Sequence, residues 1–308
     1  MKNIVNEDTK ATILLTCRFE NEDLIPLSVE EYGLVVKWLM EKAMSPANLF
    51  SETVSSKCSQ ECGFDLFRIG ELLGRGFLLG FHLESFRSNG IWTLNRGDAK
   101  YPKTWKKRLG FNSPPLIFGV GDPNLLATTT CLAVIGSRDI TEEEKKFCQY
   151  IGELCSQKNV TLVSGCARGT DSEAMTACLN SGGIVVGIVS EELLKKLSFR
   201  KFNKWVSAKK LVLASPFMPD SSFSRQNAFY CNQLIYGLAQ NALVVSSKYK
   251  KGGTWQGAAL ELGSEKPIPV FVRSSKTMPK GNSELMKLGA LEWKSEGSVD
   301  DTSKLFGQ

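Results

Sequence analysis

Residues 131–138 read CLAVIGSR, and residues 160–170 read VTLVSGCARGT. In each stretch a short apolar run leads into a glycine-bearing segment that carries an arginine. A helical pattern follows each of them, over residues 141–157 and 171–181. A buried strand followed by a helix, and then repeated, is typical of parallel βαβ units. These two stretches therefore predict an α/β fold with a mostly parallel sheet.

The same alternation continues along the chain. It predicts strands at 131–136, 160–164, 184–189, 211–214, 242–246 and 268–272. It predicts helices at 141–157, 171–181, 191–208, 225–239 and 254–263. The expected architecture is a Rossmann-like, doubly wound sheet. Because ligands bind beyond the carboxyl ends of the strands in such sheets, the loops at those ends are the candidate site.

The sequence before residue 131 has a different character. Residues 1–95 contain apolar residues at helical spacing and a short strand at 91–94, which predicts a small helical N-terminal domain. Pro114 and Pro115 favour an extended chain, so residues 96–130 are expected to form a connector with edge structure. Residues 131–294 form the predicted Rossmann-like domain, and residues 295–308 are expected to be a tail.

Composition excludes several classes of protein. The 308 residues are 42% hydrophobic and 23% charged, as in ordinary globular chains, and no apolar run reaches the roughly 18 residues of a membrane-spanning helix. Nine scattered cysteines suit a reducing compartment, so a cytoplasmic protein without membrane contact is expected. Cys58 and Cys62 are the only close pair, and His82 is the only histidine, so we expect no metal, no cofactor and no histidine-based catalysis.

Positive charge is concentrated in one part of the chain. The net charge is +6, and residues 201–250 hold seven basic residues against Asp220 alone. Such a block is typical of a surface that attracts phosphates. It is equally typical of a solvated helix face, and charge alone does not separate the two.

The loop after the first predicted strand contains Gly136, Ser137 and Arg138. Thr141 and Glu144 follow with the spacing of a capping box, which predicts a helix start beside this loop. A guanidinium and free backbone amides at a helix start can both bind a phosphate. The alternative is an arginine that is merely exposed.

Two further loops have a related composition. The second runs from Ser164 and Gly165 through Arg168 and Gly169 to Thr170, where Thr170 and Glu173 predict another capping box. Cys166 within it is expected to be a small buried filler. The third contains Lys251, Gly252, Gly253 and Thr254, with Thr254 as the expected cap of the next helix. The second loop matches neither the dinucleotide fingerprint nor the P-loop.

Several motifs, in order, resemble the DNA-processing protein A (DprA, or Smf) family over residues 66–293. They are RGDAKYP, SPPLIFGVG, GSR, SGCARGTDSEA, Gly182-Gly183, NQLIYGL (232–238) and KGGTWQGA. The Gly-Gly-Thr-Trp form, with PVFVR at 269–273, is similar to a branch found in bacterial defence and toxin-antitoxin gene pairs.

The resemblance implies a non-enzymatic protein that binds single-stranded DNA through its backbone and forms a homodimer. It implies a role in DNA recombination and natural transformation with a RecA-type recombinase, or in antiviral defence as the antitoxin or sensor paired with a phosphoribosyltransferase-like toxin. Arg138 and Arg168 would be the principal phosphate contacts. The full predicted set is Gly136, Ser137, Arg138, Ser164, Gly165, Arg168, Gly169, Thr170, Asn232, Gln233, Lys251, Gly252, Gly253 and Thr254.

The sequence departs from the family where Cys231-Asn232-Gln233 replaces an Arg-Asn-Arg motif. With two positive charges missing there, the alternatives are weaker DNA binding or use of the same pocket for a partner's nucleotide or for a protein. Double-stranded DNA stays open as a further ligand. Gly252-Gly253-Thr254 and Glu261 faintly resemble a motif of nucleoside-monophosphate hydrolases, although the spacing differs. A nucleotide-binding protein or a hydrolase of that kind is therefore the second hypothesis. A third alternative is that the helical N-terminal domain binds a protein partner.

Overall fold

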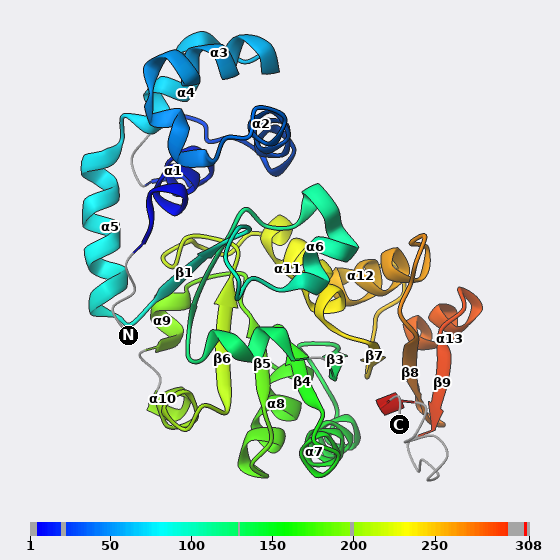
Figure 1. Cartoon of the computed structure of the whole chain (residues 1–308). Helices are drawn as coiled ribbons and strands as arrows, with labels where there is room; N and C mark the ends of the chain where they lie inside the picture. The colour runs from blue at the N-terminus through cyan, green and yellow to red at the C-terminus, as the bar shows by residue number, and fades with distance from the viewer. Residues whose placement is uncertain (1–4, 20–22, 129, 198–199, 295–304, 307–308) are drawn as a thin grey trace. The chain divides into compact units, whose positions relative to one another are not determined.

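The computed structural model describes residues 5–19, 23–128, 130–197, 200–294 and 305–306. The chain divides into two compact units (Figure 1). The first comprises Met1–Val120 and Pro216–Pro219, and the second comprises Gly121–Ser215 and Asp220–Gln308. Of the tail predicted at 295–308, all but residues 305–306 lies outside the described residues.

The first unit combines helices with a pair of antiparallel strands. Its elements are α1 (Glu7–Thr16), α2 (Val29–Glu41), a 3₁₀ turn (Pro46–Phe50), α3 (Glu52–Cys62), α4 (Leu66–Leu73), α5 (Gly76–Ser88), β1 (Trp92–Asn95), α6 (Lys103–Leu109), a second 3₁₀ turn (Gly110–Asn112) and β2 (Leu116–Val120). A capping box between Ser28 and Glu31 starts α2. Val35, Trp38 and Leu39 of α2 then pack in a buried cluster with residues of α4, which gives this unit a core of its own.

The second unit is built on a parallel sheet. Its strands are β3 (Cys131–Ile135), β4 (Thr161–Ser164), β5 (Val185–Ile188), β6 (Leu211–Ser215), β7 (Asn241–Val244), β8 (Val270–Ser274) and β9 (Leu291–Lys294). They lie in the order β6-β5-β4-β3-β7-β8-β9, and every neighbouring pair is parallel. Leu132 of β3, for example, lies between Leu162 of β4 and Asn241 of β7. The central strands are buried throughout, because helices cover both faces.

The helices of the second unit connect strands that lie on both sides of β3. They are α7 (Glu142–Gln157), α8 (Thr170–Asn180), α9 (Leu193–Leu197), α10 (Arg200–Ser207), α11 (Arg225–Leu238), α12 (Gly252–Leu262) and α13 (Lys280–Lys287), and a 3₁₀ turn (Pro123–Ala127) precedes β3. Both α8 and α11 contact β3, β4 and β5, and they lie on opposite faces of the sheet (Figure 1). The strand order reverses between β3 and β7, which makes that place the topological switch point. The doubly wound, Rossmann-like fold predicted from the sequence is therefore confirmed.

Two parts of the predicted element pattern were wrong. The single helix expected over 191–208 is two helices, α9 and α10, with residues 198–199 between them outside the described residues. In addition, β9 extends the sheet beyond the last predicted strand, and α13 connects it to β8. Strand β9 escaped prediction because it is a four-residue edge strand in which Trp293 alone is buried, so it has no apolar run.

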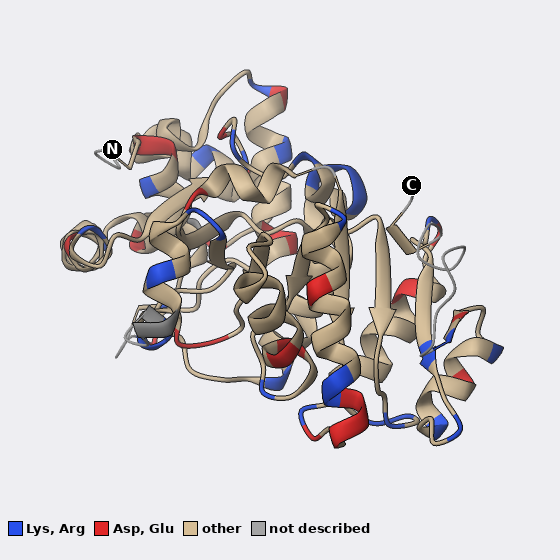
Figure 2. Ribbon diagram, turned by 90° about the horizontal axis from the view of Figure 1, so that it is seen from below, with Lys and Arg blue, Asp and Glu red and all other residues tan. Residues whose placement is uncertain are grey.

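Charge and hydropathy follow this layering. The strands are mainly tan in Figure 2, whereas the helices and the loops between them carry most lysines, arginines and acidic residues. Within the described part of the chain, no helix combines the length and the apolar composition that a bilayer crossing requires.

Candidate phosphate-binding site

The candidate site lies at the switch point, where β3 and β7 are neighbours and their carboxyl ends meet the loops that follow. In open α/β sheets, ligands bind at places of this kind, outside the carboxyl ends of the strands. Strand β4, on the other side of β3, contributes the glycine-rich loop 165–169. The hydroxyl of Ser164 at the end of β4 donates to the backbone oxygen of Val134 at 2.7 Å, which fastens the two strand ends together.

The loops after β3 and β4 pack on each other through glycines. Gly169 has φ +83°, and a Cβ there would lie 2.5 Å from the backbone oxygens of Ser137 and Arg138. A Cβ on Gly136 would overlap the side chain of Thr170. The amide of Thr170 donates to the oxygen of Ser137 at 3.1 Å. Only glycine permits this approach, so both loops are held together as one surface.

Arg138 and Arg168 project from these two loops into a shallow hollow of about 520 Å³. The charged side chains that line it are Arg138, Asp139, Lys145, Arg168 and Glu173. Three are positive and two negative, so the hollow carries a net positive charge. The two arginines predicted from the sequence are thus brought together, and Lys145 of α7 joins them from a position that the sequence pattern did not single out.

An acidic residue competes for one of the arginines. Arg168 Nη2 lies 2.5 Å from Asp139 Oδ1, and the two side chains are 77% and 70% exposed. The other arginine has a different neighbour, because the Arg138 guanidinium lies 5.2 Å from the centroid of the exposed Phe223 ring. Stacking of that kind leaves the guanidinium N–H groups available at the ring's edge.

Asp171 holds the glycine loop, and sequence reasoning missed it. Its carboxylate accepts from the amides of Gly165 at 3.1 Å and Ala167 at 3.3 Å. Burial raises the pKa of Asp171 to about 6, against the lowering effect of these amides and of Arg138. In the sequence Asp171 reads as an ordinary acidic residue in the first turn of a helix. The sequence signal that could have identified its role is the glycine-rich loop 165–169, which lies just before it in the chain.

The cap of α7 was predicted correctly, and those of the other two helices were wrong. Thr141 and Glu144 form the expected capping box. Gly169 occupies the cap position of α8, and Thr170 is the first residue of the helix, with a fully buried side chain. The Glu173 carboxylate accepts from Gln149 and does not close a capping box. Glycine displaces threonine as the cap because the chain must take a positive φ there.

The third loop reaches the first through Thr254. Helix α12 starts at Gly252 after Lys251, so Thr254 lies inside the first turn and does not cap it. Its hydroxyl donates to the backbone oxygen of Gly136 at 3.0 Å. A Cβ on Gly253 would lie 2.9 Å from the side-chain nitrogen of Asn232.

Helix α11 brings one of its two predicted residues to this cluster. Asn232 lies against the start of α12, whereas Gln233 is turned about 100° further around the helix. Cys231 is 2% exposed, and its thiol points to the backbone oxygen of Val189. The first position of the family's Arg-Asn-Arg motif is therefore occupied by a core residue.

Cys166 and His82, the cysteine and histidine weighed above, both lie in packed positions. Cys166 has φ +58° and its sulfur packs against Gly187 of β5. It is half-buried, so the expected full burial was wrong. Within the described residues no group of three or more His, Cys, Asp or Glu side chains could hold a metal ion. His82 stacks on Phe19 with ring centroids 4.9 Å apart, as expected for a packing residue.

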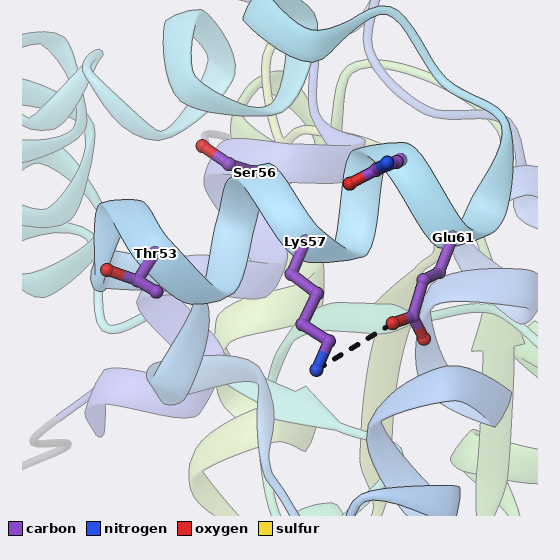
Figure 3. Close-up of a pocket in the computed structure, with 5 residues that line it drawn as sticks. Thr53, Ser56, Lys57 and Glu61 are labelled. Atoms are coloured by element: carbon purple, nitrogen blue, oxygen red, sulfur yellow. Dashed lines mark ion pairs between the residues drawn. The ribbon is translucent and has the colours of Figure 1, made fainter.

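A second hollow lies in the first unit, and its lining comes from α3 alone (Figure 3). Thr53, Ser56 and Gln60 line it with Lys57 and Glu61, whose charged atoms lie 3.8 Å apart. The Glu61 carboxylate is already held by Trp38 Nε1 at 2.7 Å and Lys42 Nζ at 3.3 Å, both from α2 or its end. The switch-point hollow, where two arginines converge, is therefore the stronger candidate site.

Fold and site together define a class: a Rossmann-like protein with glycine-lined, arginine-bearing loops at its switch point. Residues 92–303 match the family model of DNA recombination-mediator protein A, and the chain belongs to this family. It is 26% identical over 187 residues to the DNA processing protein DprA of Bacillus subtilis (strain 168), which is 59% of this chain and 62% of that protein. It is 27% identical over 159 residues to DprA of Streptococcus pneumoniae (strain R6), covering 50% of this chain and 54% of that protein.

Solved structures show the same fold. The crystal structure of DprA from Streptococcus pneumoniae covers 98% of this chain and is itself covered to 98%, with a TM-score of 0.73 at 18% identity. A structure of DNA processing protein A from Helicobacter pylori, described for its single-stranded DNA binding mode, covers 70% of this chain and is covered to 96%, with a TM-score of 0.57 at 22% identity. The matched part of the chain spans about half to three fifths of the length of the two curated relatives.

Proposed function

We propose that this protein binds single-stranded DNA through its phosphates and acts in DNA processing or recombination without itself being an enzyme. The observation that supports this most strongly is the convergence of Arg138 and Arg168 from two glycine loops at the switch point. Side chains and backbone amides together can bind a phosphodiester there without reading the base. Family membership and the relative from Helicobacter pylori, which binds single-stranded DNA, support the same function.

The remaining predicted site residues have supporting roles in this proposal. Gly136, Gly169 and Thr170 hold the two arginine loops together, and Ser164 and Gly165 anchor the second loop to β4 and Asp171. Thr254 ties the start of α12 to Gly136. The proposed phosphate-binding set is completed by Ser137, Lys251, Gly252, Gly253 and Asn232. Gln233, which is turned away from this cluster on α11, has no supported role in it.

The enzymatic alternative is weaker on geometry. Glu261 lies at the far end of α12 from Gly252, roughly 13 Å away along the helix axis. Its carboxylate is buried and accepts from the amide of Ile268 at 2.8 Å, which positions the chain before β8. The acid of the proposed hydrolase motif therefore does not join the glycine loop. Incubation with nucleoside monophosphates should release no free base.

The proposal is tested by substituting both arginines with alanine and measuring binding of a labelled single strand at low salt. We expect at least a tenfold loss of affinity, because two charge-assisted contacts disappear. The matched control is Lys209→Ala with Lys266→Ala, two exposed lysines that precede β6 and β8 at the opposite edge of the sheet. Equal affinities of the two double variants would refute the site.

The proposed function includes four further proposals: a homodimer, a recombinase partner, a toxin partner and a cytoplasmic location. Light scattering of the purified chain tests the first of these. The binding experiment should also measure the affinity for duplex DNA. A site that binds a flexible phosphate backbone should have a higher affinity for the single strand than for the duplex.

A further inference from the structure

The turn between β7 and α12 presents a tyrosine between lysines. Lys248 and Lys251 form an isolated antiparallel bridge, and the amide of Lys251 donates to the oxygen of Lys248 at 3.0 Å. Lys250 takes a left-handed φ of +54° within this turn. Tyr249 and Lys250 therefore stand at the tip of the turn, on the β7 side of the switch point.

The ring of Tyr249 contacts the ammonium groups of Lys250 and Lys280, which come from different elements. It packs edge-on to the buried Trp255, with centroids 4.9 Å apart and planes at 86°. Lys250 Nζ lies 5.3 Å from its centroid, and Lys280 Nζ at the start of α13 lies 5.2 Å from it. Cation–π attraction between the ring and each ammonium group opposes the repulsion between the two lysines.

The position of Lys280 is fixed by its neighbours. The side chain of Asn282 is fully buried, accepts from the amide of Ser247 at 2.9 Å and donates to the oxygens of Val245 and Arg273 at 3.0 and 2.9 Å. A Cβ on Gly281 would overlap Ser247. The start of α13 is thus fastened to the segment that leads from β7 into the lysine turn.

No acidic residue balances this cluster within the turn or its flanks. Residues 245–256 contain Lys248, Lys250 and Lys251 and no aspartate or glutamate, and all three lysines are exposed. Glu284 of α13 is already paired with Lys287 at 2.7 Å. A rigid surface that concentrates positive charge in this way is suited to a multiply charged anion.

We propose that Lys250 and Lys280, held at Tyr249, form a second phosphate-binding subsite that continues the path of the strand bound at Arg138 and Arg168. The two places are connected through α12, since Thr254 in its first turn donates to Gly136 beside Arg138. This inference rests on the proposed function. It adds that the bound ligand is a strand long enough to contact both sides of the switch point.

The test compares three double variants on a long oligothymidylate: Lys250→Gln with Lys280→Gln, Arg138→Ala with Arg168→Ala, and Lys209→Gln with Lys266→Gln as the control. Binding is followed by fluorescence anisotropy over a salt series. Each phosphate contact contributes about 0.7 to the slope of log K against log salt for single strands. Loss of the Lys250–Lys280 subsite should therefore lower the slope by about 1.4 and weaken binding up to about tenfold at low salt, with an unchanged melting temperature.

The outcomes separate the two claims. A lysine variant that matches the control, while the arginine variant loses binding, overturns the second subsite and leaves the proposed function standing. A wild-type protein that binds no strand at any salt overturns both. A lysine variant that loses binding to polyglutamate and keeps full affinity for the strand also overturns the subsite, because the surface would then be a site for an acidic protein.

Discussion

Neutralising Asp139 should tighten the binding of single-stranded DNA. In the free protein Arg168 is paired with Asp139 at 2.5 Å, so a phosphate must displace this carboxylate to reach the guanidinium. Both partners are more than two-thirds exposed, and the pair itself is worth at most about 1 kcal/mol. A phosphate bound at Arg168 would lie roughly 5 Å from the carboxylate, where repulsion in water is about 0.8 kcal/mol. Asp139→Asn should thus gain about 1 kcal/mol, or roughly fivefold in affinity.

The assay for this gain is fluorescence anisotropy with a labelled single strand at low ionic strength. The gain should shrink as salt is added, because screening weakens interactions between exposed charges. Glu265→Gln is the matched control, since Glu265 is an exposed acid near the opposite edge of the sheet, before β8. An Asp139→Asn protein that binds no more tightly than wild type, or no more tightly than the control, would refute this electrostatic account of the hollow.

Three further predictions concern the framework of the site. The pKa of Asp171 is about 6 in the folded protein against 3.8 ordinarily, so the folded state holds the proton more tightly, and stability should fall by about 3 kcal/mol as pH rises from about 4 to about 6. Asp171→Asn should remove this part of the pH dependence in urea unfolding, and an unchanged profile would contradict the assignment. Gly169→Ala should destabilise by about 1–3 kcal/mol and weaken DNA binding, because the residue has a positive φ and its Cβ would press on Ser137; a melting temperature equal to wild type would count against the packing. Thr254→Val should cost about 1 kcal/mol through loss of the bond to Gly136, whereas Thr254→Ser should restore most of it.

The sequence predicted the parallel sheet and the two arginine loops well, for a physical reason. Central strands such as β3 and β4 are buried on both faces, so their sequences consist of short apolar runs. The glycines that end them are required by contacts between the loops. Arg138 and Arg168 were therefore located by strand position alone.

The sequence failed where long-range packing decides the role of a residue. Thr170 and Thr254 have the residue type of helix caps, but the close approach to Gly136 turned both side chains to other uses. Asp171 looked like a helix-start acid, and its contact with the glycine loop was invisible without the fold. The same holds for Asp139, whose pairing with Arg168 joins two loops 29 residues apart.

The most direct test of the central claim is the salt dependence of binding to a labelled single strand and to its duplex, for the wild type and for Arg138→Glu combined with Arg168→Glu. If phosphates are bound at the switch point, the wild type should prefer the single strand, with little dependence on base sequence. Its affinity should fall steeply and linearly in log salt, and the folded double variant should lose most binding and most of that slope. A double variant that binds as tightly as wild type, with the same slope, would contradict the account.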